Sequence, residues 1–326
     1  MKYRTLGSTG LNVSEVGFGA WAIGGSWGRQ SDNESIATLH KALDLGVDFI
    51  DTAAGYGNGH SERLIGQVLK QRGEQDKITV ATKTPPATGP WPPSPYCKMD
   101  DLYCESYLRQ NVEERLYNLD TDCIDILQLL TWTRAWNKDP KPLDILRKLK
   151  DEGKIRYIGI STPEQDQNCV IELMQKGWVD VVQVVFNIFE QEPAAELLPV
   201  AQEHNVGIIV RVVFDEGSLT GKFTKDTQFG EGDFRNSYFA GDRLERTVER
   251  VEKIKADIDG SGYTMPQAAL KFAFGCPAVS TVIPGMRSVS QAEINCAVSD
   301  LPNMPTELVA KLHQHNWQRS LWGAGK

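Results

Sequence analysis

Three side chains, Asp51, Tyr56 and Lys83, form the most reactive combination in the sequence. Asp51 follows a short apolar strand predicted at 48–50, and Tyr56 lies in the glycine-rich turn after it. Lys83 follows the next predicted strand, at 78–82. Because the carboxyl ends of neighbouring parallel strands meet at one face of an α/β fold, we expect the three side chains to lie together at that face.

This combination suits proton transfer to a carbonyl oxygen. A carboxylate keeps a neighbouring lysine charged, and we expect that ammonium group to lower the pKa of the Tyr56 phenol from about 10 toward neutrality. Tyr56 would then act as a general acid while hydride reaches the carbonyl carbon. Each residue alone is more simply read as a surface tyrosine, a helix-capping aspartate or a solvated lysine, whereas all three at consecutive strand ends favour a catalytic site.

The elements that must position these residues alternate between strand and helix. Strands are predicted at 16–20, 48–50, 78–82, 124–129, 157–160, 181–184, 207–211 and 279–283. Helices are predicted at 33–45, 61–72, 101–119, 142–152, 165–176, 194–204, 243–258, 266–274 and 288–298. Eight such units, without a G-x-G-x-x-G turn after the first strand, predict a (β/α)8 TIM barrel of the α/β class rather than a doubly wound dinucleotide fold.

The two ends of the chain and two long loops lie outside this strand–helix repeat, and the sequence predicts a different structure for each. The short segments at 2–6 and 11–13 are typical of an N-terminal β-hairpin that plugs one end of the barrel. The loops at 85–95 and 215–241 follow strands, so we interpret them as lids rather than linkers, and we expect a single domain over 1–326. A C-terminal helix at 305–315 precedes a tail with Trp317 and Trp322 that we expect to lie over the barrel mouth.

Composition favours a cytoplasmic protein that binds neither nucleic acid nor membrane. The net charge of −8 is spread through the helices, and no basic groove, signal peptide or long apolar span is present in the sequence. Six cysteines without a C-x-x-C pair and five dispersed histidines indicate neither a disulfide framework nor a metal site. Nothing in the sequence indicates an oligomeric state.

Motifs along nearly the whole chain resemble those of the aldo-keto reductase family. They are Phe18-Gly-Ala-Trp21, the turn at 51–57 with Ser61-Glu62 and Gly66, Thr82-Lys83, Gly159-Ile-Ser161, Gln183, the segment 217–222 and the segment 283–287. The resemblance implies a TIM barrel that binds NADP(H) across its mouth and reduces aldehydes or ketones. In that reaction, hydride passes from the nicotinamide ring to the carbonyl carbon and Tyr56 supplies the proton.

The resemblance also implies the residues that hold the cofactor. Ser161 and Gln183 match the family's carboxamide ligands, whereas Thr162 replaces the usual Asn and offers only part of its hydrogen bonding. Arg287 favours NADP(H) over NAD(H), because a guanidinium group pairs well with a 2′-phosphate. The full set of predicted cofactor residues is Trp21, Ser161, Thr162, Gln183, Gly217, Ser218, Leu219, Gly221, Lys222, Gly285, Arg287, Gln291 and Asn295.

One position departs from the family pattern. Where the family has a catalytic His after Leu-Gln-Leu, this chain has Leu130. Leucine neither donates a hydrogen bond nor relays a proton, and losing such a group costs roughly 10²–10⁴ in rate. Three explanations stay open: an engineered change, a natural enzyme that works slowly on Tyr56, or a chain that binds the cofactor without turnover. The last corresponds to a regulatory or sensor protein, similar to the reductase-like subunits of ion channels.

The substrate is predicted only by class. Indole rings in predicted strand ends and loops suit a pocket for a small carbonyl or sugar-like compound, although aromatic residues in barrel loops are also ordinary packing. The predicted pocket residues are Trp21, Trp27, Trp91 and Trp132.

Overall fold

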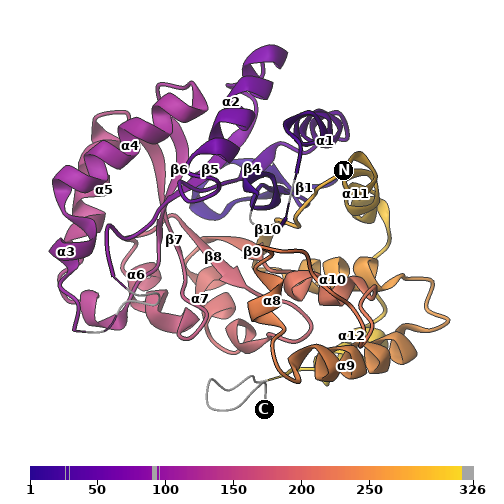
Figure 1. Ribbon diagram of the computed structural model, residues 1–326. Coiled ribbons are helices and arrows are strands. Elements are labelled where there is room, and N and C mark those ends of the chain that lie inside the picture. The colour runs from indigo at the N-terminus through magenta and orange to yellow at the C-terminus, as the bar shows by residue number, and fades with distance from the viewer. Residues whose placement is uncertain (26, 29, 90–93, 95, 318–326) are drawn as a thin grey trace.

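The computed structural model describes residues 1–25, 27, 28, 30–89, 94 and 96–317, and within them eight parallel strands curl into one sheet (Figure 1). The strands are β3 (Phe18–Gly19), β4 (Phe49–Asp51), β5 (Thr79–Thr84), β6 (Ile124–Leu130), β7 (Ile155–Ser161), β8 (Val181–Val185), β9 (Gly207–Arg211) and β10 (Val279–Val282). Each pairs with the next in chain order. Parallel bridges from Val16 to Val282 and from Gly19 to Gly285 join the two edges. The predicted (β/α)8 barrel is therefore confirmed.

Helices surround this sheet in Figure 1. Their bounds are α1 (Asp32–Asp44), α2 (His60–Arg72), α3 (Met99–Tyr103), α4 (Glu105–Leu119), α5 (Lys141–Asp151), α6 (Ile171–Gln175), α7 (Leu197–Glu203), α8 (Arg235–Tyr238), α9 (Arg243–Ile258), α10 (Met265–Phe274), α11 (Val289–Ala297) and α12 (Thr306–His313). Capping residues in the sequence explain where several of these helices begin. The Ser31 hydroxyl accepts from Glu34 N before α1, and Thr264 and Gln267 form a capping box at α10.

Two predicted helices are interrupted. The helix predicted at 101–119 is split into α3 and α4 because Cys104 has an extended backbone with ψ 156°. The helix predicted at 165–176 contains a 3-10 turn at Gln167–Val170 before the short α6. Neither break is marked by a proline or glycine in the sequence. The helical periodicity therefore predicted one continuous helix in each case.

The N-terminal hairpin closes the amino-terminal end of the barrel, as predicted. Its strands are β1 (Tyr3–Thr5) and β2 (Asn12–Ser14), and they pair antiparallel. Leu6 and Val13 from this hairpin are fully buried in a second apolar cluster with the inward-facing residues Phe49, Ala81, Ile126, Val181, Ile209 and Ile283. Gly7 has φ 53°, and a Cβ there would lie 2.2 Å from Gly207 N, so only glycine allows this approach. The carboxyl ends of the strands remain for the site.

A buried ion pair joins α2 to α4 beside the barrel. The Glu62 carboxylate is 2.7 Å from Arg115 Nε, and it also accepts from Thr82 Oγ1 at 2.6 Å and from Asn118 Nδ2 at 3.1 Å. Close packing accompanies it, since a Cβ at Gly66 would lie 2.6 Å from Leu119 O. These motif residues therefore hold the two helices together.

The loop after β9 folds back toward the barrel mouth. It contains a 3-10 segment at Asp215–Thr220 and the short helix α8, and its Phe234 ring lies 5.1 Å from the Trp21 ring. Trp317 is buried against Phe189 of the segment after β8, with ring centroids 5.5 Å apart. Trp322 and the rest of the predicted tail cover lie outside the described residues, as do residues 90–93 and 95 of the 85–95 loop.

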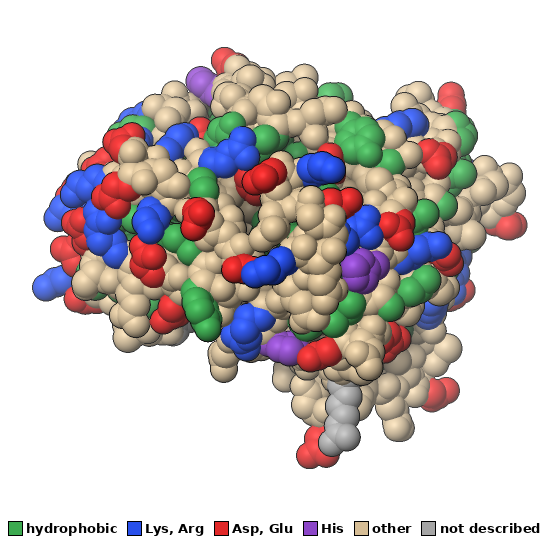
Figure 2. All heavy atoms as spheres, turned by 90° about the horizontal axis from the view of Figure 1, so that it is seen from above, with side chains coloured by type: hydrophobic (Ala, Val, Ile, Leu, Met, Phe, Trp, Pro, Cys, Tyr) green, Lys and Arg blue, Asp and Glu red, His purple; other side chains and the backbone are tan. Residues whose placement is uncertain are grey.

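The face seen in Figure 2 carries acidic and basic side chains interspersed rather than gathered by sign. None of the helices in the described residues combines the length and apolar character needed to cross a membrane. All six cysteines are free thiols. The described part of the chain holds no group of three or more His, Cys, Asp or Glu residues arranged for a metal ion.

Candidate active site

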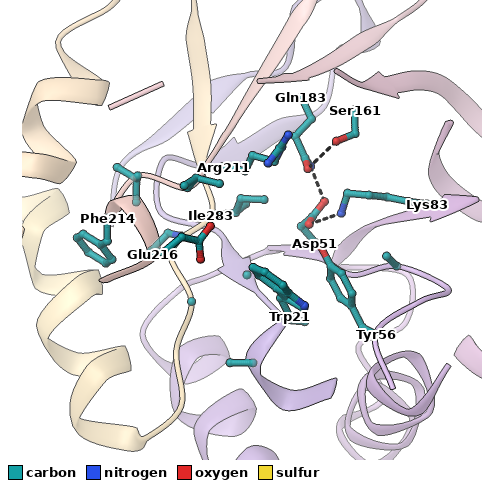
Figure 3. A pocket seen from close by; sticks show the side chains of 18 of the residues that line it. Trp21, Asp51, Tyr56, Lys83, Ser161, Gln183, Arg211, Phe214, Glu216 and Ile283 are labelled. Atoms are coloured by element: carbon teal, nitrogen blue, oxygen red, sulfur yellow. Dashed lines mark hydrogen bonds and ion pairs between the residues drawn. The ribbon is translucent and has the colours of Figure 1, made fainter. Parts of the chain in front are cut away.

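Asp51, Lys83 and Tyr56 meet at the carboxyl ends of β4 and β5 (Figure 3). Lys83 Nζ donates to Asp51 Oδ2 at 2.5 Å and to Thr52 O at 2.8 Å. The same nitrogen lies 5.2 Å from the centre of the Tyr56 ring. Lys83 and Asp51 are almost completely buried, at 1% and 2% exposure. The structure thus brings the predicted trio together.

The Asp51 carboxylate is held from its other side by two amides. Gln183 Nε2 on β8 donates to Asp51 Oδ1 at 2.7 Å, and Gln128 Nε2 on β6 donates to the same oxygen at 3.3 Å. Ser161 Oγ at the end of β7 donates to Gln183 Oε1 at 3.3 Å. This chain of hydrogen bonds keeps a buried charge solvated by the protein and fixes its direction toward Lys83.

Tyr56 differs from the sequence expectation. Burial of its hydroxyl group raises the pKa of Tyr56 above its ordinary value, and the negative Asp51 adds to that rise. Lys83 and Arg211 act in the lowering direction without overcoming burial. The predicted lowering of the Tyr56 pKa is therefore wrong, because desolvation of the phenolate outweighs the nearby cations. Tyr56 holds its proton at neutral pH.

A cavity of about 370 Å³ opens beside this trio. Its walls come from the carboxyl ends of the eight strands and from the loops that follow several of them. Figure 3 shows side chains that line it. Most of its surface is apolar, with polar groups converging from several strand ends. This combination of an apolar wall and a few fixed polar groups is typical of small-molecule and cofactor sites.

Two of the predicted tryptophans line this cavity. Trp21 packs against Tyr56 with ring centroids 6.3 Å apart and meets Trp27 edge-on at 5.8 Å. Trp132 does not line it: the residue is 1% exposed and its indole Nε1 donates to Asn137 Oδ1 at 2.7 Å. It belongs to the barrel core, so its assignment to the pocket is corrected. Trp91 lies outside the described residues.

Some of the predicted cofactor residues line the cavity, and others do not. Those that line it are Trp21, Ser161, Gln183, Gly217 and Gly285. Thr162, Ser218 and Leu219 are buried and do not line the cavity. The Thr162 hydroxyl donates to Gln183 O at 3.1 Å, so it supports the strand instead of facing the cavity.

The predicted cofactor residues Arg287, Gln291 and Asn295 lie in or just before α11. Arg287 Nε donates to Gln30 Oε1 at 3.1 Å, and Arg287 N donates to Gln291 Oε1 at 2.8 Å. Asn295 is buried in the same helix, whereas Lys222 is exposed on the loop after β9 and Gly221 packs near Met265. The guanidinium group of Arg287 is thus oriented by a side chain from the loop before α1.

The residues present fit a nicotinamide cofactor. Arg211 Nε and Trp27 Nε1 are buried donors on residues that line the cavity, and neither has a hydrogen-bond partner among the described residues. Gly285 leaves open space where a side chain would stand. Unpaired buried donors are costly, so a cavity that keeps them is suited to a ligand rich in acceptors.

A family model described as the aldo/keto reductase family matches residues 15–316. The chain belongs to this family. The aldo-keto reductase YhdN of Bacillus subtilis (strain 168) is 30% identical over 300 residues, which cover 90% of this chain and 87% of that protein. The NADH-specific methylglyoxal reductase of Escherichia coli (strain K12) is 28% identical over 318 residues, which cover 92% and 94% respectively.

The comparison with solved structures agrees with this family assignment in fold. A solved aldo-keto reductase from Bacillus halodurans, in its holo form, covers 100% of both chains with a TM-score of 0.77 and 24% identity. The family predicted from the motifs is confirmed, and with it the oxidoreductase class. Family members use NAD(P)H, and the relatives include an NADH-specific one.

Leu130 stands at the cavity wall of this aldo/keto reductase chain. It ends β6 beside Ser161 of β7, and its half-buried side chain lines the cavity. Its carbonyl oxygen accepts from Tyr103 Oη at 3.2 Å. The side chain therefore faces the cavity, but its isobutyl group offers no proton and no hydrogen bond.

Sequence reasoning missed two polar residues of the site: Glu164 and Arg211. Arg211 Nη1 donates to Glu164 Oε1 at 3.0 Å, and Arg211 Nη2 donates to Thr162 O at 3.1 Å. A signal was present for Arg211, because a charged residue ends the predicted strand 207–211 at the face where barrels carry their sites.

Proposed function

We propose that this chain reduces aldehydes or ketones, with small carbonyl or sugar-like compounds as substrates and NADPH as cofactor. The observation that carries the proposal is the buried Lys83–Asp51 pair beside Tyr56 at the wall of the cavity. A bound nicotinamide supplies the hydride. The apolar wall with Trp21 and Trp27 excludes water from the reacting carbonyl.

Tyr56 delivers the proton in this proposal. Its raised pKa keeps the phenol protonated in the resting chain, so the group is ready to donate. When the proton leaves, the phenolate gains the attraction of Lys83, whose charge Asp51 maintains. Gln183 and Gln128 fix Asp51 and so prevent the pair from moving as charge develops.

The cofactor assignment rests on the same cavity and on its rim. Ser161 and Gln183 would hold the nicotinamide carboxamide, with Gly217 and Gly285 allowing close approach of the backbone. Arg287 supports NADP(H), because its oriented guanidinium group suits a 2′-phosphate. Comparing NADPH and NADH binding in the unmodified chain and in Arg287→Ala tests this preference for NADPH, which should fall in the variant.

Leu130 is expected to limit the rate. Restoring a proton-handling side chain with Leu130→His should raise kcat/KM on a panel of sugars, aldehydes and ketones by about 10²–10⁴, as measured by NADPH absorbance. Leu130→Met is the matched control, since it keeps an apolar side chain of similar volume and should give no increase. Adding Tyr56→Phe to Leu130→His should remove the gain.

A second candidate function is that of an NADP(H)-binding regulatory or sensor protein with little turnover. Leu130 favours it, because the chain keeps the remaining polar groups of the site while an apolar group occupies the wall next to the trio. Equal inactivity of the unmodified chain and Leu130→His, with tight NADPH binding in both, would select this function over the reductase. Absence of NADPH binding would exclude both.

A further inference from the structure

Gln30 holds Arg287 at two points. It lies in the loop between β3 and α1, and 257 positions separate it from Arg287 along the chain. Gln30 Nε2 donates to Arg287 O at 2.7 Å, and Arg287 Nε donates to Gln30 Oε1 at 3.1 Å. One primary amide therefore fixes both the main chain and the guanidinium group of the same arginine.

The main chain of Arg287 is also held from the side of α11. Arg287 N donates to Gln291 Oε1 at 2.8 Å, and Gln291 N donates to Ser288 Oγ at 3.3 Å. The N–H and the C=O of Arg287 thus both have side-chain partners. Long side chains lose rotamer freedom when they bind a ligand, so an arginine that is already fixed binds at a lower entropic cost.

The elements that carry this contact are packed together. Figure 1 shows α1 and α11 side by side, and Lys41 of α1 is 2.8 Å from Glu293 of α11. The Gln30–Arg287 contact is therefore made between segments whose relative position the fold already sets. Glu293, the acid on α11, has a cation of its own in this pair.

The acid Asp233, on the loop after β9, also lies within reach of the charge of Arg287. Burial works against its ionisation, but its hydrogen bonds to Arg235 and the charges of Arg235 and Arg287 lower the pKa of Asp233. Asp233 is paired with Arg235, at 2.6 Å. Both acids near Arg287 thus form ion pairs with other cations.

Gln30 orients Arg287 without cancelling its charge. A carboxylate at position 30 would accept from the guanidinium group in the same way, but it would leave little net positive charge there and would repel an anion directly. An amide carries no net charge. The neutral side chain therefore suits an arginine whose role is to attract a phosphate group.

Resting on the proposed function, we propose that Gln30 is a positioning residue that sets the preference of this chain for NADPH over NADH. It holds the Arg287 guanidinium group in place for the 2′-phosphate, which NADH lacks. No covalent bond changes. A determinant of cofactor choice thus lies in the loop before α1, far in sequence from the arginine through which it acts.

Cofactor binding by Gln30→Met tests the proposal. Methionine keeps the length of the side chain but makes neither hydrogen bond. NADPH affinity, measured by titration calorimetry at fixed pH and salt, should fall about 5- to 20-fold, since a hydrogen bond from a charged donor is lost. NADH affinity should change by less than about twofold. The fragments 2′,5′-ADP and 5′-AMP, which differ only in the 2′-phosphate, should show the same contrast.

Gln30→Glu tests the need for a neutral side chain. It keeps the acceptor for Arg287 Nε and replaces the amide nitrogen by a charged oxygen. The preference for NADPH should fall more than in Gln30→Met, by about 10²-fold, because the new carboxylate pairs with Arg287 and repels the 2′-phosphate.

Two comparisons distinguish positioning from a purely structural role. In the Arg287→Ala background, Gln30→Met should lower the preference for NADPH no further, because the group that it positions is gone. Gln75→Met is the matched control, since Gln75 is exposed and its amide donates to Asp120 O at 3.0 Å, on another part of the barrel. Its affinities for both cofactors should follow those of the unmodified chain.

The outcomes separate the two proposals. An unchanged preference in Gln30→Met, an equal loss for both cofactors, or the same loss with and without Arg287 overturns the role of Gln30 and leaves the reductase proposal standing. Equal affinity of the unmodified chain for NADPH and NADH also overturns it. Absence of binding of either cofactor by a folded chain overturns both proposals. If Gln30→Met fails to fold, the preference of Gln30→Glu decides the matter.

Discussion

Two buried glutamates of this barrel have opposite surroundings. Glu62, between α2 and α4, is fully buried and has Thr82, Asn118 and Arg115 as partners. Glu216, at the cavity, is almost as buried and has no partner among the described residues. Burial raises the pKa of both carboxyl groups, but only Glu62 has a cation in contact to oppose it. The comparison teaches that burial alone does not define a role, because partners turn one acid into a structural link and their absence makes the other available to a ligand.

The largest effect is expected where a partner is removed. Arg115→Met leaves the Glu62 carboxylate buried without its cation, and breaking such a pair costs about 3–5 kcal/mol. Urea unfolding at pH 7 should show this loss of stability, and the double variant Arg115→Met with Glu62→Gln should recover part of it. A loss below about 1 kcal/mol would remove the contrast with Glu216.

A smaller change in folding stability, of opposite sign, is expected when Glu216 is replaced. Its pKa of about 8 in the folded chain exceeds the value of about 4.3 of an unfolded glutamate, so the folded state binds more protons between these values. Stability should therefore fall as pH rises from about 4.3 to about 8 and then level off on this account.

Replacing the acid should remove that loss. At pH 9, Glu216→Gln should be more stable than the unmodified chain by on the order of 2–4 kcal/mol, and at pH 5 the two should agree within about 1 kcal/mol. Unfolding by urea at both pH values measures the difference. A variant that is less stable than the unmodified chain at pH 9 would show that the carboxylate has a stabilising partner.

The smallest effect is expected next to Glu216. Ser218→Ala removes one donor from Asp215, whose other oxygen keeps Tyr238, and a hydrogen bond to a charged group contributes about 1.5 kcal/mol at the low end. Urea unfolding should show a loss of this size at pH 7. A loss as large as that of Arg115→Met would show that the loop, not the α2–α4 link, limits stability.

Much of the architecture could be predicted because it follows from the pattern of apolar and polar residues within each short segment. Alternating apolar strands and amphipathic helices predicted the barrel, and Asp51 and Lys83 were predicted to meet because strand ends share one face. The break at Cys104 was not predictable in this way, since the helical periodicity continues across it. Trp132 follows a strand as a pocket residue would, but its packing in the core depends on Asn137, five positions away.

The sequence by itself determined the family, the barrel and the identity of the groups that meet at its mouth, because motif spacing and strand periodicity are properties of neighbours along the chain. Only the tertiary structure decided in which direction the pKa of each group shifts. The Tyr56 pKa rises instead of falling because desolvation depends on every atom packed around the hydroxyl group. That the Glu216 carboxyl group has no partner among the described residues is visible only in three dimensions, because a missing partner is a property of the folded surroundings.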